Sequence, residues 1–363
     1  MYCFQEKILI NIRERFRWFR KIIFHGKISP EQITFFVTNK CRLNCKHCFY
    51  KDKLNKGEDA ALSEIKRISE NLGEFSFLTL TGGEPFMRDD LPEIAETFIL
   101  KNKVSRISIP TNGFEPRKIY SETQKILERC PGAEIIVKVS IDGLEDVHDG
   151  IRGVKGSYER AVETFKLLKT LKEKNRRFRA GILCTISKIN EDYLEDAFQF
   201  TDRELKPDVF GLNFIRGNVS DMDIKNVEFQ KYEKLYALIL SGLRGNYFYK
   251  AYKKFVIRAI KRIIESRRYP FSCLAGRVSA VIDANLNVFP CEALSVDMGN
   301  LRDFGYDFKK LWFSPKAMSV RNYIDGKNCV CTNECNIQNN SFFTPAILAG
   351  ILEGWAKERL KLP

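Results

Sequence analysis

Three cysteines follow an apolar, β-branched segment in one short stretch. They lie in the run Cys41-Arg-Leu-Asn-Cys45-Lys-His-Cys48, which has the spacing C-x3-C-x2-C. Three thiolates from one loop can bind three corners of an iron–sulfur cluster and leave one iron open to a small molecule. Zinc is the competing interpretation, because tetrahedral sulfur sites suit either metal. A structural zinc site normally has four protein ligands, and His47, placed between Lys46 and Cys48, is a poor fourth.

A second candidate motif, Thr81-Gly82-Gly83-Glu84-Pro85, follows the next predicted strand. Paired glycines allow a ligand to approach the backbone closely. The Glu84 carboxylate and the carbonyl groups at the strand end can bind an ammonium group. Because the turn comes one βα unit after the cysteine loop, we expect it to face the same cavity as the cysteines.

The elements that must position these loops repeat along residues 33–215. Short β-branched or aromatic runs alternate with amphipathic helical patterns, which indicates repeated βα units and a parallel sheet. The predicted strands are Ile33–Thr38, Phe75–Thr81, Val104–Pro110, Glu134–Ser140, Phe178–Ile186 and Val209–Phe214. The predicted helices are Leu62–Leu72, Leu91–Leu100, Arg117–Arg129, Tyr158–Lys174 and Asp192–Leu205. Six units are too few to close an eight-stranded barrel, so we expect an open, partial (βα)6 TIM-like barrel of the α/β class, with its chemistry at the carboxyl ends of the strands.

In order along these units, the motifs resemble those of the radical S-adenosylmethionine (radical SAM) superfamily. The three-cysteine loop matches the family's motif for a [4Fe–4S] cluster, and Gly82, Gly83 and Glu84 match the motif that binds the amino group of S-adenosylmethionine. Further matches follow strands three and four: Thr111-Asn112-Gly113, Val139-Ser140-Ile141-Asp142-Gly143 and His148-Asp149-Gly150-Ile151-Arg152-Gly153.

The resemblance implies a role for each matching residue. Cys41, Cys45 and Cys48 would bind the cluster, with His47 and Phe49 near the adenine. Ser140 and Asp142 would lie near the ribose or the carboxylate, and Arg152 would pair with the methionine carboxylate, as bidentate guanidinium chemistry favours. Asn112 would belong to the same cofactor pocket. Taken singly, either Ser140 or Asp142 is better interpreted as a strand-end cap than as a ligand.

The same resemblance implies a reaction. An electron from a donor such as flavodoxin or ferredoxin would pass through the cluster to the sulfonium of S-adenosylmethionine, giving methionine and a 5′-deoxyadenosyl radical that takes hydrogen from a substrate. The cofactors perform that chemistry, while the protein supplies orientation and a closed cavity.

A second group of cysteines lies after residue 271 and resembles the auxiliary-cluster extension called SPASM, or its shorter form, twitch. Cys273 and Cys291 bracket a predicted hairpin with strands Val278–Asp283 and Asn287–Phe289, and Cys329, Cys331 and Cys335 follow. The full form has two clusters and about seven cysteines, so five cysteines favour one auxiliary [4Fe–4S] cluster. We expect Cys273 and Cys291 to bind it with two of the other three, and a structural zinc is the alternative. For the remaining cysteines, Cys3, Cys130 and Cys184, a buried thiol is the default.

Composition and charge limit the cellular compartment and the protein class to which this chain can belong. The 363 residues carry a formal net charge of +14 and include 11 cysteines. The apolar run from Ile8 to Ile12 is flanked by charges, unlike a secretory signal peptide. The odd cysteine count therefore suggests a reducing cytoplasm with metal-binding or reactive thiols. No stretch reaches the roughly 20 apolar residues that a membrane span needs.

Much of the positive charge falls on two amphipathic patterns. In the first 26 residues, an apolar stripe begins at Ile8 and Ile12 and is accompanied by arginines and lysines. Near Tyr252–Arg267, the basic residues Lys253, Lys254, Arg258, Lys261 and Arg262 accompany a second apolar stripe. Such helices can lie on an anionic membrane at the inner surface, or they can pack their stripes on the barrel. Nucleic acid is a less favoured partner, because no binding module accompanies the charge.

These patterns predict five segments: a basic amphipathic helix (1–32), a radical SAM partial barrel (33–245), a basic linker helix (246–270), an auxiliary-cluster domain (271–343) and a C-terminal helix (344–363). The resemblance to peptide-modifying maturases suggests a peptide or protein side chain as substrate. The first alternative is a membrane-associated enzyme that acts on a lipid or lipid-linked molecule. The second is a non-catalytic zinc-binding interaction protein.

Overall fold

The computed structural model describes residues 29–243 and 245–360. The predicted N-terminal helix, apart from residues 29–32, and Cys3 lie outside the described residues. The described strands form one nine-stranded sheet in the order β6-β5-β4-β3-β2-β1-β7-β8-β9. The strands are β1 (Gln32–Thr38), β2 (Phe77–Gly82), β3 (Arg106–Thr111), β4 (Glu134–Ser140), β5 (Phe178–Ile186), β6 (Val209–Phe214), β7 (Ser279–Ile282), β8 (Asn287–Phe289) and β9 (Gly299–Asn300).

Alternation along each parallel strand separates a core face from a cavity face. In β1, Ile33, Phe35 and Val37 are completely buried in the core, whereas Gln32 and Thr34 line a cavity inside the curved sheet. This follows from the two-residue period of a strand, which sends successive side chains to opposite faces. The partial barrel therefore has an apolar outer face covered by helices and a polar inner face.

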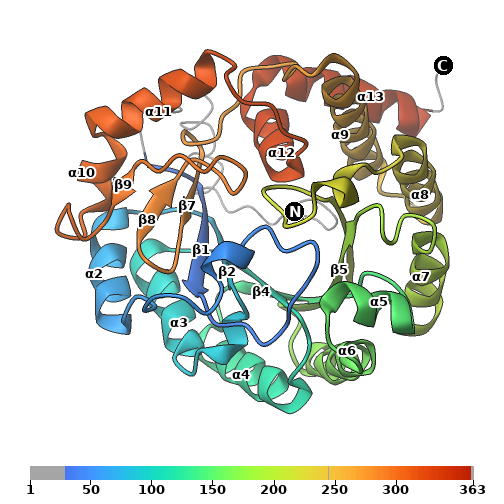
Figure 1. Cartoon of the computed structure of the whole chain (residues 1–363), viewed down its shortest axis with the longest axis horizontal. Coiled ribbons are helices and arrows are strands. Elements are labelled where there is room, and N and C mark those ends of the chain that lie inside the picture. Colours follow the sequence, from blue (N-terminus) through green and yellow to red (C-terminus); the bar gives the residue numbers. More distant parts are fainter. Residues whose placement is uncertain (1–28, 244, 361–363) are drawn as a thin grey trace.

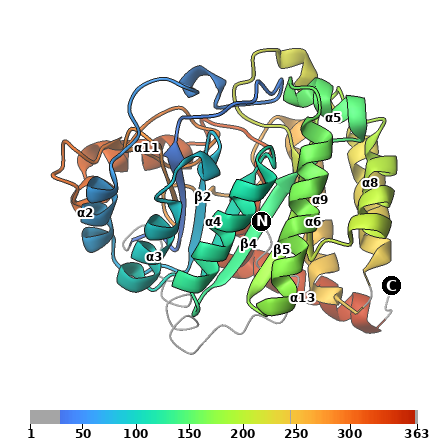
Figure 2. The same ribbon diagram turned by 90° about the horizontal axis from the view of Figure 1, so that it is seen from below.

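Helices cover the outer face of this sheet (Figure 1), and α3, α4 and α6 lie side by side along it (Figure 2). The helices of the barrel are α2 (Leu62–Leu72), α3 (Leu91–Asn102), α4 (Pro116–Arg129), α5 (Glu145–Arg152), α6 (Ser157–Lys174) and α7 (Leu194–Phe200). Those that follow are α8 (Phe229–Gly242), α9 (Tyr247–Ser266), α10 (Phe308–Trp312), α11 (Pro315–Asp325), α12 (Glu334–Phe343) and α13 (Pro345–Leu360). The mixed α/β fold and the partial barrel predicted from the sequence are confirmed.

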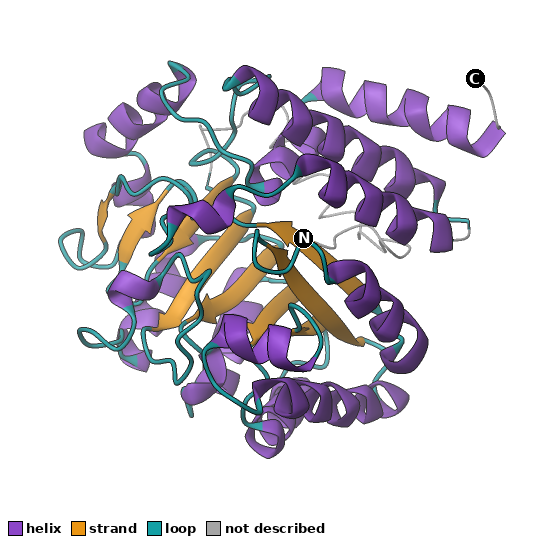
Figure 3. Ribbon diagram, turned by 45° about the vertical axis from the view of Figure 1, so that its right-hand side comes forward, coloured by secondary structure: helices purple, strands orange, loops and turns teal. Residues whose placement is uncertain are grey.

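The cysteine-rich C-terminal region continues the sheet of the barrel. Strand β7 pairs with β1 in parallel, with Ile33 opposite Ala280. Strands β8 and β9 then add antiparallel neighbours. Figure 3 shows the strands as one continuous surface surrounded by helices. The predicted hairpin therefore lies beside the strand that leads into the cysteine loop.

The basic pattern of α9 differs from the predicted surface stripe at one position. Lys253 is completely buried, and its ammonium group lies 3.1 Å from Glu334 of α12. The apolar residues Val256, Ile260 and Ile263 are buried as well, because α9 packs against α12 and α13. The apolar side of this helix is thus covered by protein. Within the described residues, no helix combines the length and apolar character needed to cross a membrane.

Candidate active site

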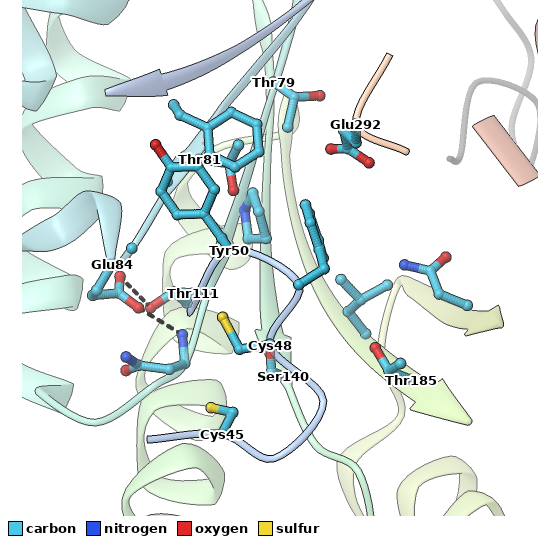
Figure 4. A pocket seen from close by; sticks show the side chains of 18 of the residues that line it. Cys45, Cys48, Tyr50, Thr79, Thr81, Glu84, Thr111, Ser140, Thr185 and Glu292 are labelled. Atoms are coloured by element: carbon cyan, nitrogen blue, oxygen red, sulfur yellow. Dashed lines mark hydrogen bonds between the residues drawn. The ribbon is translucent and has the colours of Figure 1, made fainter. Parts of the chain in front are cut away.

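A cavity of about 240 Å³ lies inside the barrel at the carboxyl ends of its strands. Side chains from the cysteine loop, from the turns after β2 and β3 and from the end of β4 converge on it (Figure 4). Arg152, at the end of α5, lines it as well. The predicted site residues that line it are Cys41, Cys45, His47, Cys48, Phe49, Gly82, Gly83, Glu84, Asn112, Ser140 and Arg152. Residues from four βα units therefore meet in one place, as the position of each motif after its strand predicts.

Hydrogen bonds of polar side chains hold the start of the cysteine loop. Asp59 accepts from the backbone N–H of Asn39 at 2.7 Å and from the hydroxyl of Thr38 at 2.6 Å. The Tyr50 hydroxyl donates to the Asn39 side chain at 2.6 Å. Asn55 forms two hydrogen bonds with the backbone of Cys41, each 3.0 Å long. The first cysteine is thus fixed by contacts that span the whole loop.

The two glycines after β2 make room for this loop. A Cβ atom on Gly83 would lie 2.2 Å from the carbonyl oxygen of Lys40, and one on Gly82 would lie 2.3 Å from that of Thr38. The backbone N–H of Gly83 donates to the Thr38 carbonyl oxygen at 2.8 Å, and that of Glu84 donates to the Lys40 carbonyl oxygen at 2.7 Å. The close approach that the paired glycines allow is therefore made by the backbone of the cysteine loop.

Glu84 is buried beneath the loop and accepts three hydrogen bonds. The Thr111 hydroxyl donates at 2.8 Å and the backbone N–H of Asn112 at 2.7 Å (Figure 4). The backbone N–H of Phe86 adds a third at 3.2 Å. Burial raises the pKa of Glu84 to about 7 despite these donors. The carboxylate ties the turn after β2 to the turn after β3 and still faces the cavity.

Arg152, the last residue of α5, lies on the other side of the cysteine loop. Its guanidinium is 2.5 Å from Asp142 Oδ2 and donates to Cys45 Sγ at 3.8 Å. The Arg152 carbonyl accepts from the backbone N–H of Asn44 at 3.2 Å. Asp142 is completely buried, and its ion pair holds the Arg152 guanidinium in place. Ser140 lines the cavity directly.

Burial governs the protonation of the other groups around the loop. It lowers the pKa of His47 to about 4, so the imidazole is neutral at neutral pH. It raises the pKa values of the Cys41 and Cys48 thiols to about 11. A bound metal would have to displace these protons, as metal binding to thiols generally does.

The donor set of the loop fits an iron–sulfur cluster. Cys41, Cys45 and Cys48 face the same cavity, and the loop is fixed on both sides. Among the described residues, no three Cys, His, Asp or Glu side chains are grouped closely enough to bind one metal ion. A [4Fe–4S] cluster can take three thiolates from one loop, because each binds a different iron and the fourth iron can stay open. A structural zinc ion normally takes four protein ligands, so three loop cysteines suit a cluster better.

Four of the five C-terminal cysteines share a second, smaller cavity. Cys273 precedes β7, Cys291 follows β8, and Cys329 and Cys331 precede α12; all four line this cavity. Cys335 instead lines the large cavity, because it lies in the first turn of α12. The structure thus separates the fifth candidate ligand from the other four. Cys130 and Cys184 are buried in the core.

The large cavity also includes residues that the sequence analysis did not select. Asn213 belongs to β6, Arg216 follows that strand, Glu292 follows Cys291, and Thr185 lies near the end of β5; all four line the cavity. Thr185, Asn213 and Arg216 could have been selected from the sequence because they lie at or near the ends of predicted strands. Glu292 comes from the C-terminal hairpin, and its place in the cavity depends on the pairing of β7 with β1.

Comparisons with known proteins agree with this architecture. A model of the radical SAM superfamily matches residues 35–201. The antilisterial bacteriocin subtilosin biosynthesis protein AlbA of Bacillus subtilis is 26% identical over 79% of this chain, which spans 60% of AlbA. The AdoMet-dependent heme synthase of Methanosarcina barkeri is 27% identical over 78% of this chain and 82% of its own length.

Two solved structures share the fold over most of the chain. A structure of anSMEcpe with bound AdoMet and a peptide has a TM-score of 0.56 at 15% identity and covers 91% of this chain and 99% of its own. Streptococcus suis SuiB bound to the precursor peptide SuiA has a TM-score of 0.56 at 18% identity and covers 87% of this chain and 73% of its own. The family model thus identifies residues 35–201 as a radical SAM domain, a type of domain that uses a [4Fe–4S] cluster and S-adenosylmethionine as cofactors, and the two solved structures share its fold.

Proposed function

We propose that this chain is a radical SAM enzyme that removes a hydrogen atom from a peptide or protein side chain. One observation carries the proposal: the cavity lined by the three loop cysteines extends to polar residues of β6 and of the C-terminal hairpin. It offers cofactor-binding groups at one end and unassigned polar groups at the other. When bound, the cluster and S-adenosylmethionine supply the one-electron cleavage that yields a hydrogen-abstracting 5′-deoxyadenosyl radical.

The residues of the chain orient these cofactors. Cys41, Cys45 and Cys48 hold the cluster, and Arg152, kept in place by its 2.5 Å contact with Asp142, binds the carboxylate of S-adenosylmethionine. A buried ion pair of this kind keeps the guanidinium in one orientation. His47 and Phe49 contact the adenine, and Ser140 and Asn112 complete the pocket.

Glu84 has a double role in this proposal. It fixes the turns after β2 and β3 by accepting from Thr111 and Asn112, and its remaining lone pairs bind the ammonium group of S-adenosylmethionine. A positive group beside Glu84 would favour the ionised carboxylate and lower its raised pKa. Cofactor binding and ionisation of Glu84 would then reinforce each other.

The second cavity provides the auxiliary cluster site. Cys273, Cys291, Cys329 and Cys331 line it together and would bind all four irons of one [4Fe–4S] cluster. The Asn336 side-chain amide donates to Cys331 Sγ at 3.9 Å, a contact that orients this thiolate. Cys335 lies outside the set.

Two lines of support favour a peptide over a lipid. Relatives of this chain include AlbA and the sporulation killing factor maturation protein SkfB of Bacillus subtilis, and anSMEcpe and SuiB have been solved with peptides bound. Most of the apolar residues of α9, which suggested a membrane surface, are buried, among them Val256, Ile260 and Ile263. The similarity to a heme synthase makes a porphyrin the main competitor.

The cofactor assignment is tested by substituting the central cysteine of the loop. With the reconstituted enzyme under anaerobic conditions, dithionite and S-adenosylmethionine should give 5′-deoxyadenosine, measured by liquid chromatography. Cys45→Ala should lower its formation about 1,000-fold or more, because the cluster loses a ligand. Cys130→Ala, a buried thiol outside both cavities, is the matched control. Full activity of Cys45→Ala would overturn the assignment.

The substrate class is tested by offering three kinds of molecule to the active enzyme. These are synthetic peptides encoded by short reading frames beside the gene, anionic lipid vesicles and iron coproporphyrin. Mass spectrometry would follow changes in the mass of each. The proposal predicts a modified peptide and an increase in 5′-deoxyadenosine formation with that peptide alone. Modification of the lipid or the porphyrin instead would refute it.

A further inference from the structure

An ion pair lines the large cavity beside Phe49. Arg216 and Glu292 form it, with 2.6 Å between the guanidinium and the carboxylate. Their side chains are 17% and 13% exposed, and both line the cavity. Figure 4 shows Glu292 well separated from Cys45 and Cys48. The cofactor roles proposed above use neither residue.

Packing against the cysteine loop holds Arg216 in place. Its guanidinium lies 5.5 Å from the centre of the Phe49 ring, a cation–π distance. The next residue, Gly217, has a φ of +70°, and a Cβ atom there would lie 2.6 Å from Cβ of Phe49. Glycine therefore allows the loop after β6 to pack directly on the cysteine loop. Arg216 joins three segments: that loop, the cysteine loop and the C-terminal hairpin.

Two buried atoms near this pair lack partners. Neither Arg216 Nε nor Asn213 Oδ1 has a hydrogen-bond partner among the described residues, and both atoms are buried. Leaving a buried donor or acceptor unpaired costs about 1–3 kcal/mol. One atom is a donor and the other an acceptor, and both side chains line the cavity at the end of β6. A ligand group that both donates and accepts would satisfy them together.

The charges of Arg216 and Glu292 limit which chemical groups of a ligand can bind there. Glu292 offsets the positive charge of Arg216, so the pair presents no net charge to the cavity. An anionic group such as a carboxylate would have to compete with Glu292 for the guanidinium, and an alkyl chain would leave both unpaired atoms buried. A neutral amide supplies a carbonyl acceptor and an N–H donor and requires no net charge.

We propose that Asn213, Arg216 and Glu292 form a substrate subsite that binds a peptide amide. Arg216 Nε donates to the amide carbonyl, Asn213 Oδ1 accepts from an amide N–H, and Glu292 holds the guanidinium in position. The subsite deepens the proposed function and rests on it for the peptide class of the substrate. It places the substrate backbone between β6 and the hairpin, with the side chain to be modified free to face the cysteine loop.

A binding experiment that requires no turnover tests the subsite. The probe is a tetra-alanine peptide capped with acetyl and N-methylamide groups, added to the reconstituted enzyme with S-adenosylmethionine. Equilibrium dialysis with mass spectrometry measures its dissociation constant. We expect Asn213→Leu and Arg216→Lys to weaken binding at least tenfold. Arg216→Lys keeps the positive charge but lacks the Nε donor, so it separates hydrogen bonding from the ion pair.

Controls distinguish this result from misfolding and from failure of the proposed function. Arg129→Lys alters an exposed arginine paired with Glu93 and Glu96 and should leave peptide binding unchanged. All variants should bind S-adenosylmethionine as the parent enzyme does. Peptide binding is measured without dithionite. A defect in 5′-deoxyadenosine formation would therefore not change the measured dissociation constant. Unchanged peptide affinity in both cavity variants, or tighter binding of hexanoate or monodecanoylglycerol than of the peptide, would overturn the subsite.

Discussion

The two cysteine groups reach their cavities by different structural routes. The loop group lies within residues 41–48 and is clamped between the Gly82-Gly83 turn and the end of α5. The C-terminal group comes from three segments between Cys273 and Cys331, which meet because β7 pairs with β1 and α12 packs on α9. The cysteines of the first group are thus close in sequence and are held by backbone contacts with the turn after β2 and the end of α5. Those of the second group are brought together by the packing of segments that are distant in sequence.

The largest expected effect is a loss of bound iron, which should distinguish the two cysteine groups. Cys45→Ala and Cys331→Ala should each remove about four irons per chain, because each disrupts one [4Fe–4S] cluster. Cys335→Ala should remove none, since Cys335 lines the other cavity. Iron and sulfide assays after anaerobic reconstitution measure all three. Loss of iron in Cys335→Ala equal to that in Cys331→Ala would break the separation of the fifth cysteine from the other four.

The packing of α12 on α9, which positions the C-terminal cysteine group, can be tested at Lys253. Its ammonium group is completely buried with Glu334 and donates to the Tyr236 hydroxyl at 3.0 Å. Lys253→Met would leave the carboxylate buried and uncompensated, which should cost about 3–5 kcal/mol of the free energy of unfolding. Glu334 precedes Cys335 and begins α12, so auxiliary iron should fall while loop iron persists. Urea denaturation and iron assays would show this.

The double variant Lys253→Met/Glu334→Leu is the matched control. Removing both charges leaves no unpaired ion, so it should be less destabilised than Lys253→Met alone. If both variants lost the same stability, packing of the lysine stem would matter more than its charge.

The support of the loop group should depend on pH through His148. This residue of α5 accepts from the backbone N–H of Asp142 at 3.1 Å, and burial lowers its pKa to about 4 from 6.5. Between these values the unfolded chain binds the extra proton, so stability falls as pH drops from 6.5 towards 4. The full effect is roughly 3 kcal/mol. His148→Gln should flatten the dependence of the unfolding midpoint on pH, and an unchanged slope would contradict this assignment.

The contrast between the groups also explains what could be predicted from sequence. The bounds of β4, β5 and β6 were predicted in full, because short β-branched or aromatic runs between amphipathic helical patterns mark parallel strands. The cysteine loop was recognisable because its three cysteines lie within eight consecutive residues. The exclusion of Cys335 was not, because it depends on where α12 begins. The Arg216–Glu292 pair was also missed, as it joins two segments distant in sequence through sheet pairing.

The smallest expected effect concerns the backbone contact between the turn after β2 and the cysteine loop, which a substitution at Gly83 tests. A Cβ atom there would lie 2.2 Å from the Lys40 carbonyl oxygen and 3.0 Å from that of Asn39. Both contacts are backbone atoms, so Gly83→Ala must displace the cysteine loop, at a cost of about 1–3 kcal/mol. Gly132→Ala is the control, because a Cβ atom there meets nothing within 4 Å and should change stability by less than about 0.5 kcal/mol. Thermal unfolding measures both variants, and iron assays should show loss from the loop site alone in Gly83→Ala. Equal behaviour of the two variants would mean that the loop adapts to the turn, and that the clamp on the first cysteine group comes from α5.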